Sequence, residues 1–211
     1  MNRLSRILQR YGWRTIFVLP AIAAARVDLI GAVVRLNRLR LTTLGYKGRG
    51  VHWGRHISVT PGAHLVLGDG AYVGDRCVLE VNVGSAARVS VGRDTWISHD
   101  CHIASRGAVF IGDQVLLGEF VSLRDTTHSY ADPAVPVRRQ QDSVGSIVIE
   151  DDVWIGRGTL VLGRPAGTVI GRGAVIGANS VVSHSVPPFA VVAGAPARLI
   201  RMRNEPGISQ V

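Results

Sequence analysis

Apolar residues recur every six positions through most of the chain. The residue after each of them is mostly small or acidic, and the residue four places on is mostly small or β-branched. A short fixed period of this kind is typical of a parallel β-solenoid, in which three hexapeptides make one coil and each side is a very short strand. The recurring positions are Leu67, Val73, Leu79, Val91, Ile97, Ile103, Ile111, Leu117, Leu123, Ile149, Ile155, Val161, Ile170, Ile176 and Val182.

The six-residue interval lapses at four places. Ser85 occupies one of the apolar positions, and short insertions precede Ile111 and Ile170. The longest lapse is the polar segment 124–146, which reads RDTTHSYADPAVPVRRQQDSVGS. Insertions in a solenoid become loops at one corner, often on the binding face. We therefore expect the chemistry of the protein to lie on segment 124–146.

Residues 1–45 lack the six-residue interval and contain an apolar run over 15–25. The spacing predicts two helical segments with a break near Pro20. An arginine-rich start followed by an apolar run also resembles a secretory signal peptide. The run is short for a membrane span, so a helix on a surface or packed on the protein is our prediction. The predicted organisation is a helical extension over 1–45, a solenoid over 46–203 and a tail over 204–211.

The amino-acid composition indicates what fills the core, and the distribution of charge indicates which partners the protein could bind. Hydrophobic residues make up 46% of the chain but aromatic residues only 6%, which fits a core of Val, Ile, Leu and Ala. Residues 1–40 hold eight arginines and one aspartate, so +7 of the net charge of +9 lies there. A nucleic-acid-binding body would spread its basic residues along a face, so we expect no nucleic-acid partner. A basic arm suits an anionic membrane surface, an acidic partner or plain solvation.

The two cysteines, Cys77 and Cys101, both occupy the small position of the repeat. They are four intervals apart, or one coil and a third, which predicts that they lie on different faces and form no disulfide. Buried thiols in a reducing compartment are the expected state.

Histidines are the main candidates for chemistry. His128 lies in the long lapse three residues after Asp125, where it could take a proton from a hydroxyl while Asp125 orients its ring. A solvated histidine is the alternative. His99 and His102 could join His128 in a three-histidine zinc site. Side chains three apart in extended chain point to opposite faces, which disfavours that site.

The end of the repeat reads SVPPFAVVAGAPARLIRMR and contains Arg198, Arg201 and Arg203. Clustered arginines beside the last coil could bind the phosphates of a nucleotide cofactor. Solvated C-terminal charges are the alternative.

The repeat, RDTTHSYADP, DDVWIG and VVAGAPARLIR together resemble the hexapeptide-repeat acyltransferases. Within this family the chain is similar to the maltose and galactoside O-acetyltransferases over about residues 50–203. Residues 1–45 are closer to the longer N-terminal segments of polysaccharide-modifying members. The resemblance implies an all-β fold, a left-handed parallel β-helix, although crossovers between parallel strands are normally right-handed. It also implies a homotrimer with each active site between neighbouring helices, acetyl-CoA as the acyl donor, and no metal.

The same resemblance assigns roles residue by residue. His128 in TTH matches the catalytic histidine, Trp154 the aromatic residue near the pantetheine and acceptor cleft, and Asp100 an acceptor-contacting position that is commonly Asn. We group His99 with Asp100 on the acceptor side. Arg157 stands beside the cofactor arm, where the family often has a small residue. The remaining cofactor-binding positions are Ala178 and Ser183, which match residues lining acetyl-CoA, and Arg198 and Arg201, which match basic residues near its phosphates.

The sequence thus predicts a cytoplasmic, acetyl-CoA-dependent O-acetyltransferase that acts on a sugar or glycan. The basic arm over 1–40 is a candidate for contact with the inner face of the membrane. Alternatives that stay open are a zinc enzyme of the hexapeptide carbonic anhydrase type and a serine acetyltransferase-like enzyme. A non-catalytic scaffold would lose the loop histidine or the arginine ending, and this chain keeps both.

Overall fold

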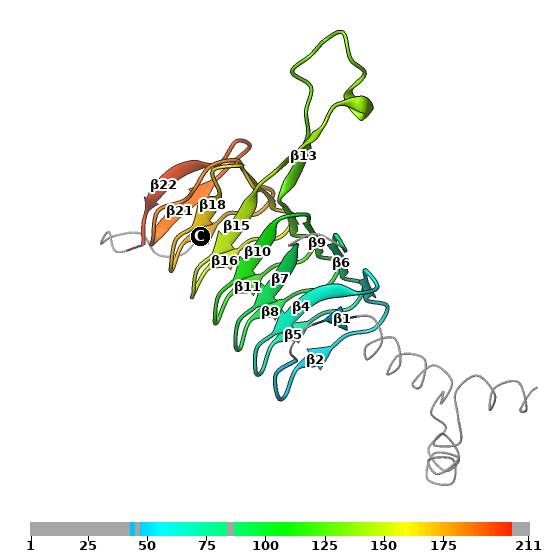
Figure 1. Cartoon of the computed structure of the whole chain (residues 1–211). Helices are drawn as coiled ribbons and strands as arrows, with labels where there is room; N and C mark the ends of the chain where they lie inside the picture. The colour runs from blue at the N-terminus through cyan, green and yellow to red at the C-terminus, as the bar shows by residue number, and fades with distance from the viewer. Residues whose placement is uncertain (1–42, 45–46, 84–86, 204–211) are drawn as a thin grey trace, which may run out of the picture. The chain divides into compact units, whose positions relative to one another are not determined.

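The computed structural model describes residues 43–44, 47–83 and 87–203, which form a left-handed parallel β-helix (Figure 1). The fold class is therefore as predicted. The first described strand begins at Thr43, three residues before the predicted boundary. The rest of the predicted helical extension, the proposed membrane-contacting arm 1–40 and the tail 204–211 lie outside the described residues. Within the described ranges, no helix has the length and apolar character to cross a bilayer.

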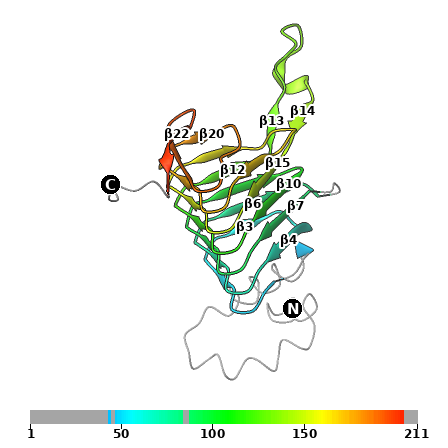
Figure 2. The same ribbon diagram turned by 90° about the vertical axis from the view of Figure 1, so that its left-hand side faces the viewer.

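Three parallel sheets form the sides of the coil (Figure 2). The first sheet contains β1 (Thr43–Leu44), β4 (Ala63–Leu67), β7 (Arg88–Val91), β10 (Ala108–Ile111), β15 (Ser146–Ile149) and β18 (Thr168–Ile170). The second contains β2 (His52–Trp53), β5 (Tyr72–Val73), β8 (Trp96–Ile97), β11 (Leu116–Leu117), β16 (Trp154–Ile155), β19 (Val175–Ile176), β21 (Ala190–Ala193) and β22 (Arg198–Met202), the last strand antiparallel. The third contains β3 (Ser58–Val59), β6 (Val78–Val81), β9 (His102–Ser105), β12 (Ser122–Arg124), β17 (Leu160–Leu162) and β20 (Val181–Val182).

The recurring apolar residues fill the inside of the coil. Leu67, Val73 and Leu79 lie on consecutive sides and are at most 3% exposed. Ile97 and Leu117, which follow Val73 in the second sheet, are fully buried in the same register. Burying each such side chain stabilises the fold by roughly 1.5–3 kcal/mol. The sequence period is thus the spacing of inward-pointing side chains around one coil.

Three corners connect the sheets, and they differ in regularity. The first corner joins the first sheet to the second, and the second corner joins the second sheet to the third. The second corner places one residue per coil in the left-handed region, with φ of 56–60° at His56, Arg76, Asp100, Phe120 and Asn179. The third corner, from the third sheet to the first, takes up all four lapses of the repeat. The prediction that insertions project from one corner is therefore confirmed.

The cysteine prediction was wrong in one respect. Val78 pairs with His102, so Cys77 and Cys101 stand on equivalent sides of adjacent coils, and the Val78 amide donates to the Cys101 carbonyl at 2.9 Å. The chain passes from the third sheet to the first between Val81 and Arg88, and 24 residues separate Val78 from its partner His102 on the next coil. Both thiols are free and buried.

Candidate active site

The longest lapse forms a hairpin that leaves the third corner (Figure 2). Its strands, β13 (Thr126–His128) and β14 (Asp142–Val144), pair antiparallel, and the loop between them carries the 3₁₀ turn η2 (Val137–Arg139). His128 and Asp142 are cross-strand partners, with His128 Nδ1 2.6 Å from Asp142 Oδ1. A carboxylate at Nδ1 holds the proton on that nitrogen and leaves Nε2 as the basic one.

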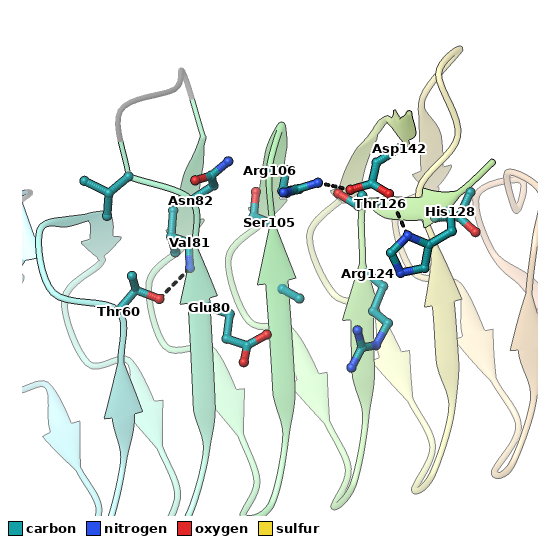
Figure 3. A pocket seen from close by; sticks show the side chains of 13 residues that line it. Thr60, Glu80, Val81, Asn82, Ser105, Arg106, Arg124, Thr126, His128 and Asp142 are labelled. Atoms are coloured by element: carbon teal, nitrogen blue, oxygen red, sulfur yellow. Dashed lines mark hydrogen bonds and ion pairs between the residues drawn. The ribbon is translucent and has the colours of Figure 1, made fainter. Parts of the chain in front are cut away.

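Arg106 completes a three-residue cluster with His128 and Asp142. Its Nη1 donates to Asp142 Oδ2, so each oxygen of the carboxylate has its own partner. Figure 3 shows Arg106 and His128 on opposite sides of Asp142. Arg106 belongs to the turn between β9 and β10, in the body of the solenoid, whereas the other two residues belong to the hairpin. The ion pair therefore fixes the hairpin to the coil and fixes the carboxylate that orients the imidazole.

Asp125 lies beneath this cluster and does not orient His128, which corrects the sequence prediction. The side chain is fully buried, and its carboxylate accepts hydrogen bonds from the amides of Arg106 (2.8 Å) and Gly107 (2.9 Å). The hydroxyls of Ser105 (2.7 Å) and Thr126 (2.9 Å) also donate to it. His128 follows Asp125 by three residues in extended chain, so its side chain points to the opposite face, outward from the coil. Asp125 thus fixes the turn that carries Arg106.

A pocket of about 640 Å³ opens beside His128. Its floor is the outer face of the third sheet, and hydrogen-bonding side chains from β13, β12 and β6 line it, among them Thr126, Arg124 and Glu80. Arg106 and Asp142 line it as well (Figure 3). A concave site with convergent polar groups beside an oriented histidine is the arrangement expected of an active site.

Polar contacts connect the strands of the floor. Arg124 Nη2 lies 3.2 Å from His102 Nδ1, and His102 Nε2 lies 3.1 Å from Glu80 Oε2. The three residues come from β12, β9 and β6, which are neighbours in the third sheet. Two arginines and two carboxylates line the pocket, so their charges balance. Such a surface suits a ligand rich in hydroxyl groups more than one of strong charge.

The predicted acceptor residues His99 and Asp100 lie at the second corner and do not line this pocket. The Asp100 carboxylate accepts from Arg76 at 2.7 and 2.5 Å, and His99 Nδ1 lies 2.9 Å away. The guanidinium of Arg76 and then the imidazole of His99 lower the pKa of Asp100 from 3.8 to about 2. Their acceptor role stays a prediction.

The predicted cofactor residues lie apart from His128 in the single chain. Trp154 is on the second sheet and is 52% exposed, and the Arg157 guanidinium lies 5.1 Å from the ring centre of Phe120. Ala178 is exposed one coil further on at the second corner. Ser183 and Arg198 line a separate cavity of about 190 Å³ on the last coils, and Arg201 follows on β22.

The three histidines of the zinc alternative do not meet. His99 pairs with Asp100, His102 lies between Glu80 and Arg124, and His128 pairs with Asp142. Among the described residues no three histidine, cysteine or acidic side chains form a group that could hold a metal ion.

Sequence reasoning missed Asp142, Arg106, Arg124 and Glu80. Asp142 stands in the lapse that was singled out, and Arg106 stands in the insertion before Ile111. Both lapses lie at the same corner of the coil, so polar residues in them could have indicated a shared site. Arg124 is the first residue of the segment 124–146, whereas Glu80 is an outward position on an ordinary strand, which carries no signal in the repeat.

Comparison with known proteins places the chain among acetyltransferases, although no family model matches it. A galactoside O-acetyltransferase of Escherichia coli is 32% identical over 176 residues, which cover 80% of this chain and 80% of that protein. A Mycobacterium tuberculosis protein named as a probable acetyltransferase is 32% identical over 177 residues, 81% of this chain and 56% of the relative. The chain spans just over half the length of several such relatives.

A solved structure shares the fold. It is a hexapeptide-repeat-containing acetyltransferase of Vibrio cholerae in complex with acetyl-CoA, with a TM-score of 0.56 and 24% identity. The match covers 85% of this chain and 81% of that one. At this identity the likeness supports the fold.

Proposed function

Since the chain belongs to the hexapeptide-repeat acyltransferase family, we propose that it transfers an acetyl group from acetyl-CoA to a hydroxyl of a sugar or glycan. The observation that carries the proposal is the Arg106–Asp142–His128 cluster at the edge of a pocket lined by hydrogen-bonding groups. The galactoside O-acetyltransferase, as its name states, acts on a sugar.

His128 acts as the general base. Nε2 takes the proton from the acceptor hydroxyl as its oxygen attacks the carbonyl carbon of the donor, and the imidazolium then returns a proton to the leaving sulfur. Asp142 stabilises the imidazolium, and Arg106 keeps the carboxylate in place. Acetyl-CoA, when bound, supplies the acetyl group as an activated thioester. The hydroxyl attacks it directly, without a covalent enzyme intermediate, because both cysteines are buried within the coil.

The residues at the C-terminal end fit a phosphate-bearing donor. Arg198 and Ser183 line the cavity on the last coils, and both supply hydrogen-bond donors for phosphate oxygens. Arg201, half-buried on β22, adds a second guanidinium.

Self-association as a homotrimer is part of this proposal. In one chain Trp154, Arg157 and Ala178 lie away from the pocket of His128, so a second copy is needed to complete a site between coils. The outer face of the second sheet offers an apolar surface, since Trp96, Leu116 and Trp154 are in register and 42–52% exposed. Contiguous exposed apolar side chains of this kind mark protein interfaces. The solution mass of the full chain tests the trimer.

The activity is tested by release of free CoA thiol from acetyl-CoA in the presence of a panel of hexoses and glycans. Acetylation of a sugar hydroxyl that persists in EDTA supports the proposal. Activity that EDTA abolishes and zinc restores would favour the zinc alternative instead.

A further inference from the structure

We infer that the acceptor is a glycan chain of roughly three sugar units, bound along the outer face of the third sheet from His128 toward β3. The inference rests on the proposed function and names the substrate class of the same site. Its basis is a row of side chains in register across four neighbouring strands.

The row consists of Thr60, Glu80, Ala104 and Arg124. Glu80 pairs with Ala104 and Ala104 with Arg124, and the Thr60 amide donates to Leu79, which places Thr60 opposite Glu80. All four residues line the pocket beside His128. Adjacent strands are about 4.8 Å apart, so the row is about 14 Å long.

The row has the shape of a trough. Ala104 has no side chain beyond Cβ, whereas Glu80 and Arg124 on either side of it project over the floor (Figure 3). Arg124 and Glu80 each contact His102 through one atom, so their remaining N–H donors and carboxylate oxygen can hydrogen-bond a ring that lies over Ala104. Farther along, Thr60 Oγ1 accepts from the Val81 amide and keeps its own proton to donate.

The length of the trough decides between a single sugar and a chain. A pyranose unit in a glycan advances by about one strand spacing, so three units match the row. The volume of about 640 Å³ exceeds what one ring needs and lies in the range of roughly 300–1,000 Å³ for larger ligands. His128 stands at the Arg124 end, so the sugar that is acetylated lies there and the rest of the chain extends over Ala104 and Glu80.

The test is a chain-length series for one sugar that the wild-type protein acetylates, from monomer to tetramer. We expect kcat/KM to rise at least about 10-fold from monomer to trimer, the effect of one or two additional hydrogen bonds, and then to level off. In Glu80→Gln and in Ala104→Leu, the loss on the trimer should exceed the loss on the monomer. Glu119→Gln, a matched change at the second corner outside the pocket, should keep the wild-type profile.

Equal kcat/KM for all lengths would overturn the inference and leave the proposed function standing. The inference also fails if Glu80→Gln lowers kcat/KM for monomer and trimer by the same factor. Failure of the wild-type protein to acetylate any sugar, while it still binds acetyl-CoA, contradicts the proposed function itself.

Discussion

The molecule contains two clusters in which an aspartate lies between an arginine and a histidine. At the second corner Asp100 contacts Arg76 and His99, and at the hairpin Asp142 contacts Arg106 and His128. In both clusters the histidine uses Nδ1, so the chemistry of the groups is the same.

Their surroundings differ. His99 and Asp100 are sequence neighbours at a tight corner, and the His99 ring lies edge-on to Phe120 with ring centres 6.3 Å apart. Arg106, His128 and Asp142 come from separate segments and line a pocket. The same side-chain combination therefore occurs in two settings, and only the hairpin cluster lines the pocket in which we propose that the transfer takes place.

The largest expected effect separates the two histidines. His128→Ala removes the proposed general base and should lower kcat/KM by about 10²–10⁴-fold. His99→Ala, the matched change at the second corner, removes no proton acceptor from the pocket of His128, so kcat should stay within about two-fold of wild type, while KM for the acceptor rises if the predicted acceptor role of His99 holds. Acetyl-CoA binding by both variants, measured by calorimetry, is the control. Similar losses in the two variants would remove the distinction between the clusters.

Substitution of Asp142 should lower activity more than substitution of Asp100. A hydrogen bond to a charged group contributes ~1.5–3 kcal/mol, so Asp142→Asn should lower kcat by roughly 10- to 100-fold. Steady-state kinetics of Asp100→Asn provide the comparison. A small effect at Asp142 together with a large one at Asp100 would place the chemistry at the second corner.

Asp125 should affect stability more than chemistry. Asp125→Asn replaces an oxygen that accepts two buried hydrogen bonds, so the free energy of unfolding should fall by ~1–3 kcal/mol. Chemical denaturation of this variant and of Asp142→Asn measures the difference, because the exposed Asp142 cluster is expected to contribute less. Unchanged stability in Asp125→Asn would contradict its role in the turn of Arg106.

The smallest effect is a pH dependence at the second corner. Arg76 lowers the pKa of Asp100 to about 2 from 3.8, so the ion pair contributes stability above pH 3.8 that is lost as the pH falls toward 2. The Tm difference between wild type and Asp100→Asn should therefore be constant near neutral pH. It should become smaller as the pH falls from 4 to 2. A Tm difference that widens in this acid range would contradict the assignment.

The fold was predictable because its signal is repeated many times. Each coil presents its own apolar residue at each side, as at Leu67, Val73 and Leu79, so single irregularities do not hide the period. The pattern counts Ser85 as one position of the repeat, whereas the chain passes from the third sheet to the first between Val81 and Arg88. The length between two apolar positions does not reveal whether the chain runs along a sheet or leaves it. Counting that position is why the sequence predicts Cys77 and Cys101 on different faces of the coil.

The candidate site was predictable only in part. The lapse over 124–146 led to His128, since a break in a regular pattern can be read from one sequence. The partner of His128 depends on the pairing of β13 with β14, whose register places Asp142 opposite it after a long loop. Arg106 depends on which turns share the third corner. These contacts are long-range, and no local pattern encodes them.

The position of the proposed acceptor trough on the coils predicts how its acceptor preference should change with temperature. Each coil of a solenoid contacts only its neighbours, so order is lost from an end inward, coil by coil. Glu80 and Arg124 lie two strands apart in the third sheet, and Thr60 lies nearest its β3 end. Fraying from that end shortens the trough before it reaches His128. Mild heating should then change which acceptor length is preferred before it changes the rate of transfer.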